Sequence, residues 1–272
     1  MTESAQQPDD FPVWVAQPFQ CFACYCQDSM QVFDRSLRGL RFVTDANLAE
    51  RLASAPPEAH AAITEQERNT FIRHAQLVLG QGIVTLWDYL EVFVHDLLGV
   101  WMAYRPDTPT RLASEKIKLT GDLVEYEHLP EDERYTQLAK LLLGKVSEIG
   151  IDAYEKAFKI VGLSGAPPPN TQSVLDEMRR RRNVLVHRGG VADRAFAQGR
   201  ADLGVAPGEI VARYLALYSR YVQVVLSYVA ALLVRVGRVL GVTVEQTALG
   251  LHYATWLPSS SGAASESAAS TI

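Results

Sequence analysis

The segment RRNVLVHRGG holds the residues of this chain that are best suited to chemistry on a phosphate ester. Arg182, Asn183 and His187 stand around an apolar stretch at 184–186. An imidazole exchanges protons near neutral pH, as acid or base catalysis requires, and a guanidinium holds two phosphate oxygens in its planar fork. On a regular helix Asn183 and His187 share a face, whereas Arg182 and His187 lie about 140° apart. The long arginine side chain has to span that gap.

The charge around this segment is strongly positive, although the whole chain has a net charge of −5. Between residues 179 and 200 seven arginines stand against one acid, Asp193, which gives a local net charge of +6. The overall balance excludes a protein coated with basic groups, and the local excess favours an anionic partner bound at this one segment. The alternative is that the run of four arginines only keeps one face of a helix solvated.

The elements that must position these residues are helices. Two long stretches without proline, 58–105 and 208–257, follow prolines that suit a first helical turn. A third pattern over 131–166 fits one or two helices. A fourth helix is capped near Asn170, Thr171 or Ser173 and ends at Gly189 and Gly190, which places His187 in its last turn. In the last long stretch, apolar and aromatic residues recur every three or four positions: Ile210, Tyr214, Leu217, Tyr221, Val224 and Tyr228. The predicted class is all-α.

Three parts are expected along the chain. Residues 1–55 form an extension of uncertain fold, in which FPVWVAQPFQCF is predicted to be an isolated strand or an irregular arm. Residues 56–257 form the helical domain, and the Ser- and Ala-rich residues 258–272 form a disordered tail. The run 221–234 has 14 residues without a charge, short of the roughly 20 needed to cross a bilayer, so no membrane span is expected. The acidic start, MTESAQQPDD, does not resemble a signal peptide, which favours a cytoplasmic protein.

Arg182, Asn183 and His187 match the signature of the HEPN family (higher eukaryotes and prokaryotes nucleotide-binding domains), and over residues 66–241 the chain resembles that family. The earlier helix LWDYLEVFVHDLL, the sequence from Gly189 through Asp193 and the long closing helix from about Gly208 to Gly241 also look like it. The resemblance implies a bundle of about four to six helices. It also implies a homodimer in which two Arg and His pairs face each other and, in many members, metal-independent cleavage of RNA.

That activity would assign roles to particular residues. His187 would transfer protons, Arg182 would stabilise the charge on the phosphorane, and Asn183 would orient the phosphate or the imidazole. Because one histidine cannot act as base and acid at once, a two-fold dimer would supply the second imidazole. The RNA-binding surface would be the remaining arginines of the segment: Arg179, Arg180, Arg181 and Arg188. Glu91, one turn after Asp88, would be a carboxylate that orients Arg182.

The resemblance therefore predicts an endoribonuclease for single-stranded RNA, acting in defence or in toxin-type growth control, with a possible regulatory protein partner. Toxins of this family that pair with a nucleotidyltransferase antitoxin typically carry a tyrosine two positions after the histidine. Here that position is Gly189, so this pairing is not expected. The alternative function is a catalytically inactive HEPN-like module that binds protein or nucleic acid. A purely structural helical adaptor is a third class.

No cofactor or metal is expected. Cys21, Cys24 and Cys26 lie within six residues, yet no fourth ligand stands nearby, so they are predicted to be free thiols rather than a zinc site or a disulfide framework. A His and a Glu four residues apart occur at Glu91 and His95, but the zinc-protease pattern H-E-x-x-H is absent. The sequence also lacks the phosphate-binding loop G-x-x-x-x-G-K-[ST] and the dinucleotide fingerprint G-x-G-x-x-G, which leaves nucleotide hydrolysis and dinucleotide redox chemistry without a motif.

Overall fold

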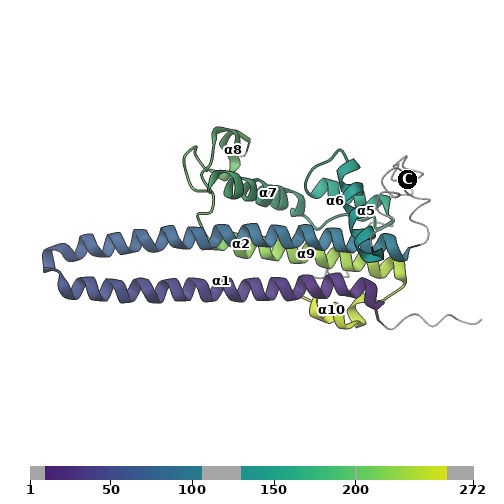
Figure 1. The fold of residues 1–272 in the computed structure, drawn as a ribbon, viewed down its shortest axis with the longest axis horizontal. Coiled ribbons are helices and arrows are strands. Elements are labelled where there is room, and N and C mark those ends of the chain that lie inside the picture. Colours follow the sequence, from purple (N-terminus) through teal and green to yellow (C-terminus); the bar gives the residue numbers. More distant parts are fainter. Residues whose placement is uncertain (1–9, 106–129, 200, 256–272) are drawn as a thin grey trace, which may run out of the picture. The chain divides into compact units, whose positions relative to one another are not determined.

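A computed structural model describes residues 10–105, 130–199 and 201–255. Within these ranges the chain forms eight α-helices and three short 3₁₀ helices, without a β-strand (Figure 1). The α-helices are α1 (Val13–Ser54), α2 (His60–Tyr104), α5 (Glu131–Lys145), α6 (Ile151–Ile160), α7 (Thr171–Arg188), α8 (Arg194–Gly199), α9 (Leu215–Leu240) and α10 (Ala248–His252). The 3₁₀ helices are η1 (Pro57–Ala59), η2 (Ala201–Leu203) and η3 (Val244–Gln246). The all-α class is confirmed.

The expected number of four to six helices is too low. The N-terminal region contributes a helix of 42 residues, and α8 and α10 have only 6 and 5 residues. Helices of one or two turns have too few residues to show a period, so a sequence pattern does not reveal them. The predicted disordered tail, 258–272, lies outside the described residues.

The interpretation of FPVWVAQPFQCF as a strand or arm is wrong, because Val13 opens α1. Four buried residues, Val15, Phe19, Phe22 and Cys26, recur at spacings of four, three and four. This period places them on one helical face, and their burial stabilises the helix. Pro18 lies inside the helix, where it removes one backbone hydrogen bond.

The chain divides into two compact units, each built from separate parts of the sequence. Unit 1 comprises Met1–Ala23, Leu90–Asp176 and Gln223–Ile272, and unit 2 comprises Cys24–Tyr89 and Glu177–Val222. The described part of the N-terminal region, residues 10–55, therefore contributes to both units.

Hydrogen bonds from three side chains connect the helices around the core of unit 1. The Trp101 indole donates a hydrogen bond of 3.0 Å to the Val161 carbonyl, and both side chains are buried. Glu155 accepts hydrogen bonds from Tyr228 and Arg235, each at 2.8 Å. Burial and the neighbouring Glu155 raise the pKa of the Tyr228 phenol. These contacts link α2, α6 and α9 within the unit.

Unit 2 contains an antiparallel hairpin made of residues 24–54 of α1 and 60–89 of α2, closed by η1 (Figure 1). Arg51 pairs with Glu67 near the closed end, and the rings of Tyr25 and Tyr89 stack at 5.1 Å near the other end. The second segment of unit 2 packs against α2. Gly80 permits this approach, because a Cβ there would lie 2.8 Å from a methyl carbon of Leu185.

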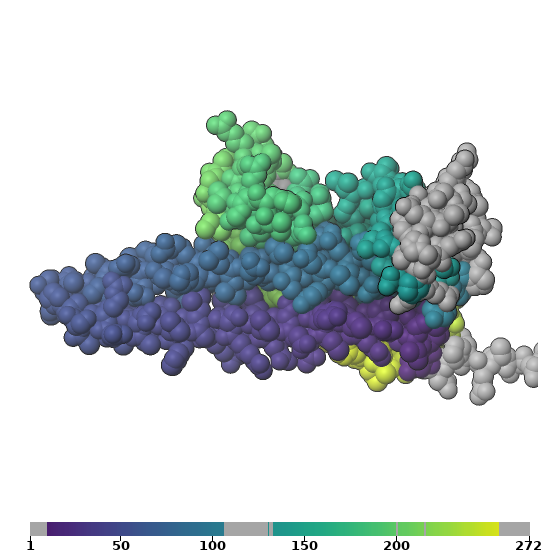
Figure 2. All heavy atoms as spheres, in the orientation of Figure 1, coloured from purple at the N-terminus to yellow at the C-terminus, as the bar shows by residue number. Residues whose placement is uncertain are grey.

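The predicted start of the last long helix near Gly208 is wrong, since α9 begins at Leu215. Backbone groups of the preceding residues bond to the chain after α7 instead. Val211 donates to the Gly190 carbonyl, and Gly208 donates to the Ala192 carbonyl. A small apolar cluster fills the space between these segments: Val184, Ala192, Phe196, Val205 and Val211. The result is a compact lobe, drawn in green in Figure 2, that follows the end of α7.

Two helical stretches, Pro57–Tyr104 and Ala216–Leu240, are long and apolar enough by length and composition to cross a membrane. Core helices of soluble proteins pass the same test, and 67% of the apolar window in Ala216–Leu240 is buried inside the protein.

Candidate functional site

The predicted end of the helix that carries His187 is confirmed. α7 ends at Arg188, and Gly189 and Gly190 follow with φ angles of +59° and +82°. These left-handed conformations suit glycine because it has no Cβ. The Gly190 amide donates back to the Val184 carbonyl at 3.1 Å. The turn leaves His187 exposed in the final turn of the helix.

Arg182 is anchored by a carboxylate of α2. Its Nη2 lies 3.0 Å from the Asp88 Oδ1, with 24% of the Arg182 side chain and 47% of the Asp88 side chain exposed. The Arg182 Nε is buried and has no hydrogen-bond partner among the described residues. The pair therefore fixes the Nη2 side of the guanidinium, the Nε is enclosed by the protein, and only a part of the side chain remains accessible to another ligand.

The carboxylate found beside Arg182 is Asp88 rather than Glu91. Asp88 precedes Glu91 by about one turn of α2 and belongs to unit 2 with Arg182, whereas Glu91 belongs to unit 1. The main-chain carbonyl oxygen of Glu91 lies 2.7 Å from the Nδ1 of the His95 imidazole. An orienting role for Glu91 stays a prediction, and the observed partner of Arg182 is Asp88.

Asn183 and His187 are less constrained than Arg182. Asn183 is half-buried, and the side chains of both residues make no hydrogen bond or ion pair within the described part of the chain. No described contact joins either of them to Arg182. The structure therefore places all three residues on the last two turns of α7 without linking their functional groups inside one subunit.

Arg181 is buried and is held by contacts within the protein. Only 6% of the residue is exposed, its Nε lies 3.1 Å from Glu177 Oε1, and its Nη1 donates to the Val211 carbonyl. The guanidinium also lies 6.0 Å from the ring centre of Phe196. A group held on all these sides inside the fold does not fit the RNA-binding role predicted for it.

The other predicted RNA-binding arginines are more accessible. Arg188 is 60% exposed and lies 3.3 Å from the Asp193 carboxylate. Arg179 and Arg180 are half-buried, and both already have partners within the protein. Arg188 is therefore the most accessible member of the predicted surface, and Asp193 partly offsets its charge.

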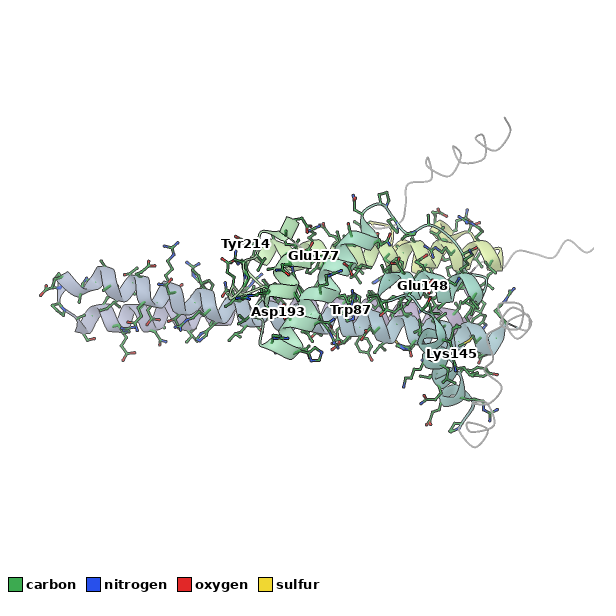
Figure 3. The ribbon with its side chains drawn as sticks, turned by 90° about the horizontal axis from the view of Figure 1, so that it is seen from above. Trp87, Lys145, Glu148, Glu177, Asp193 and Tyr214 are labelled. Carbon is green, nitrogen blue, oxygen red and sulfur yellow. The ribbon has the colours of Figure 1, made fainter. Side chains whose placement is uncertain are left out.

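The sequence interpretation missed a buried polar cluster around Glu177, which is labelled on α7 in Figure 3. Its Oε1 accepts hydrogen bonds from Arg181 and from the Tyr221 hydroxyl at 2.8 Å, and its Oε2 accepts one from Arg220 at 3.1 Å. Burial, chiefly, raises the pKa of the Tyr221 phenol above its usual range. The four-residue spacing of Glu177 and Arg181 was the available signal. The cluster fastens α7 to α9 within unit 2 and supports the helix that carries Arg182.

The cysteines differ in environment. Cys24 is exposed, Cys21 is half-buried and Cys26 is buried, and all three are free thiols. Burial raises the pKa of the Cys26 thiol to about 12. In the described ranges, no three His, Cys, Asp or Glu side chains are grouped so that they could hold a metal ion.

Comparisons of this sequence with protein-family models and with curated proteins gave no match, and the structure matched no solved structure. The resemblance to the HEPN family thus rests on the residues of α7 and on the order of the helices.

Proposed function

We propose that this chain is a HEPN-like, metal-independent endoribonuclease that cleaves single-stranded RNA at a composite site in a homodimer. The observation that carries the proposal is the arrangement at the end of α7. Asp88 anchors Arg182, whose side chain is partly exposed, and His187 is exposed in the final turn of the same helix. One cationic group that cannot lose its charge and one imidazole suit attack on a phosphodiester.

The reaction would use the 2′-hydroxyl of the RNA itself. His187 removes the proton from this hydroxyl, the 2′-oxygen attacks the phosphorus, and the 5′-oxygen leaves with a proton from the partner subunit's His187. Arg182 stabilises the charge on the phosphorane oxygens, because Asp88 occupies only its Nη2. The products are a 2′,3′-cyclic phosphate and a 5′-hydroxyl. Asn183 would hold the phosphate or the imidazole.

The proposal extends to the setting of the protein. A reaction that cuts RNA by this route suits a cytoplasmic protein of defence or toxin-type growth control, held in check by a protein partner. It needs neither a metal ion nor a membrane. Arg188, and to a smaller extent Arg179 and Arg180, would bind the phosphates that flank the cleaved bond.

A second candidate is a HEPN-like module that binds RNA or protein without cleaving it. It is favoured by one observation: no described side chain orients His187, whereas the base in a catalytic pair is usually positioned by a third group. Under this alternative the arginines bind the partner and His187 has no essential role.

The deciding experiment incubates the full-length protein with labelled single-stranded RNAs in the presence of a chelator. Cleavage with 2′,3′-cyclic phosphate ends is expected, and His187→Ala and Arg182→Ala should abolish it. His74→Ala is the matched control, because His74 is an exposed histidine of α2 in the same unit. Intact RNA, or loss of cleavage only when the chelator is present, contradicts the proposal. RNA binding that survives His187→Ala without any cleavage supports the second candidate.

The composite site has its own test. When wild-type and His187→Ala chains are mixed in equal amounts at constant total protein and allowed to exchange, roughly a quarter of the dimers carry two imidazoles. Activity should fall to that fraction. A fall to one half would show that each subunit cleaves RNA with its own histidine alone.

A further inference from the structure

Unit 1 contains a cavity of about 560 Å³. None of the residues that line it belongs to the arginine segment, residues 179–200. Residues from the start of α1, the end of α2 and the start of α5 line it. A volume in this range suits a small organic ligand. Its lining combines aromatic rings, one carboxylate and one thiol: Trp14, Tyr104, Tyr135, Asp96 and Cys21.

Aromatic rings form part of the cavity wall on two helices. Trp14 and Tyr104 stack with their ring centres 4.8 Å apart and an angle of 15° between the planes. Trp14 also lies 6.0 Å from the buried Trp101, which fixes it from the interior side of the unit. Tyr135 adds a third ring to the lining from α5. The faces of such rings carry partial negative charge and attract cations, most strongly organic ammonium groups that are easily desolvated.

Asp96 is the charged group of this cavity. The residue is half-buried, and its carboxylate makes no hydrogen bond or ion pair with any described residue. Its burial raises its pKa, which the neighbouring His95 partly opposes. A carboxylate held partly out of water without a hydrogen bond or ion pair to a described residue is unfavourable, and a bound cation relieves this cost.

The residues that line the cavity favour one class of ligand over three others. An anion would be repelled by Asp96. A neutral apolar ligand would remove the carboxylate further from water without supplying a partner for it. A divalent metal ion requires several oxygen ligands, and Asp96 is the one carboxylate among the described residues that line the cavity. An organic cation uses the aromatic rings and the carboxylate together.

We infer that this cavity binds a small organic ammonium ion, with Asp96 as its counter-charge and Trp14, Tyr104 and Tyr135 as its aromatic wall. This site is independent of the proposed RNA cleavage, because none of these residues belongs to the arginine segment or to unit 2. The bound group would be a methylated or primary amine on a short carbon chain, of a size that the cavity encloses.

The test uses choline and its uncharged isostere 3,3-dimethyl-1-butanol with the full-length protein. The two molecules differ by the charged nitrogen and otherwise share their shape. Titration calorimetry should show saturable choline binding that is about tenfold tighter than binding of the isostere. Asp96→Asn should remove this preference, while Asp28→Asn, a carboxylate that lines a separate cavity of unit 2, should leave it unchanged.

Cys21 provides a second readout inside the same wall. Saturating choline should slow alkylation of Cys21 but not of the exposed Cys24, which serves as an internal control. Tyr104→Leu, a change at a residue that is 59% exposed and so leaves the fold intact, should weaken choline binding if Asp96→Asn proves unstable. The inference is overturned if the isostere binds as tightly as choline or if Asp96→Asn keeps the full preference. It is also overturned if no saturation occurs below about 10 mM.

Discussion

Two adjacent arginines of α7 should give opposite results when each is replaced by alanine. Arg181→Ala should destabilise the protein and leave cleavage by the folded fraction intact. Arg182→Ala should abolish cleavage and leave stability almost unchanged. The contrast follows from the partners of the two side chains, since Arg181 is buried against Glu177 and Arg182 meets Asp88 near the surface.

The magnitudes follow from burial. The Arg181 and Glu177 side chains are 7% and 2% exposed, and removing one partner of a buried pair costs about 3–5 kcal/mol. Glu177 keeps its hydrogen bonds from Arg220 and Tyr221, so the lower end, about 3 kcal/mol, is expected. The pair between Arg182 and Asp88 is partly solvated, and such pairs contribute about 0.2–1 kcal/mol.

Urea denaturation followed by circular dichroism gives the free energy of unfolding of each variant. RNA cleavage is then measured under conditions in which both variants are folded. A loss of less than about 1 kcal/mol for Arg181→Ala would refute the structural role of this residue. Equal losses of stability for the two variants would refute the distinction between them. Arg73→Ala, at an exposed position of α2 in unit 2, is the control for removal of a positive charge.

Two further predictions concern stability. Asp193→Ala removes the carboxylate that accepts a 2.8 Å hydrogen bond from the Phe196 amide at the start of α8. The free energy of unfolding should therefore fall by about 1 kcal/mol. An unchanged melting temperature would contradict this capping role. Because the folded protein keeps the Cys26 thiol protonated up to a pKa of about 12, against 9.0 for a free thiol, its stability falls as the pH rises between these values. From pH 8 to pH 10 the wild type should lose about 1.4 kcal/mol more than Cys26→Ala in urea titrations, and parallel losses would show that this thiol does not contribute.

Much of α7 could be predicted from the sequence because its signals are local. The polar residues after the proline run and the two glycines after Arg188 mark both ends of the helix within the sequence itself. α1 was missed because the first 55 residues as a whole show no clear period, although the buried residues from Val15 to Cys26 have a helical one. The burial of that face outweighs the hydrogen bond lost at Pro18.

The roles within the site depend on contacts between distant parts of the chain. Four consecutive arginines point in directions 100° apart, so one of them has to face the protein, and only the packing of α7 selects Arg181. In the same way Asp88 and Glu91 lie one turn apart, and their sequence positions do not distinguish them. Asp88 is the carboxylate that pairs with Arg182, a residue 94 positions away in the sequence, and only the folded structure shows this contact.

The contacts of unit 2 differ greatly in the length of chain that they must close. Arg51 pairs with Glu67, only 16 residues further along the chain, so the hairpin can fold outward from its turn as soon as α2 is synthesised. The contact between Arg182 of α7 and Asp88 of α2 spans 94 residues, and the contact between Ser29 of α1 and Tyr218 of α9 spans 189. A ribosome releases the N-terminal hairpin long before α7 and α9 emerge. Under the proposed function, the RNA-cleavage site of a nascent chain is therefore incomplete until both α7 and α9 have been made, so RNA near the ribosome would not be cut before that point.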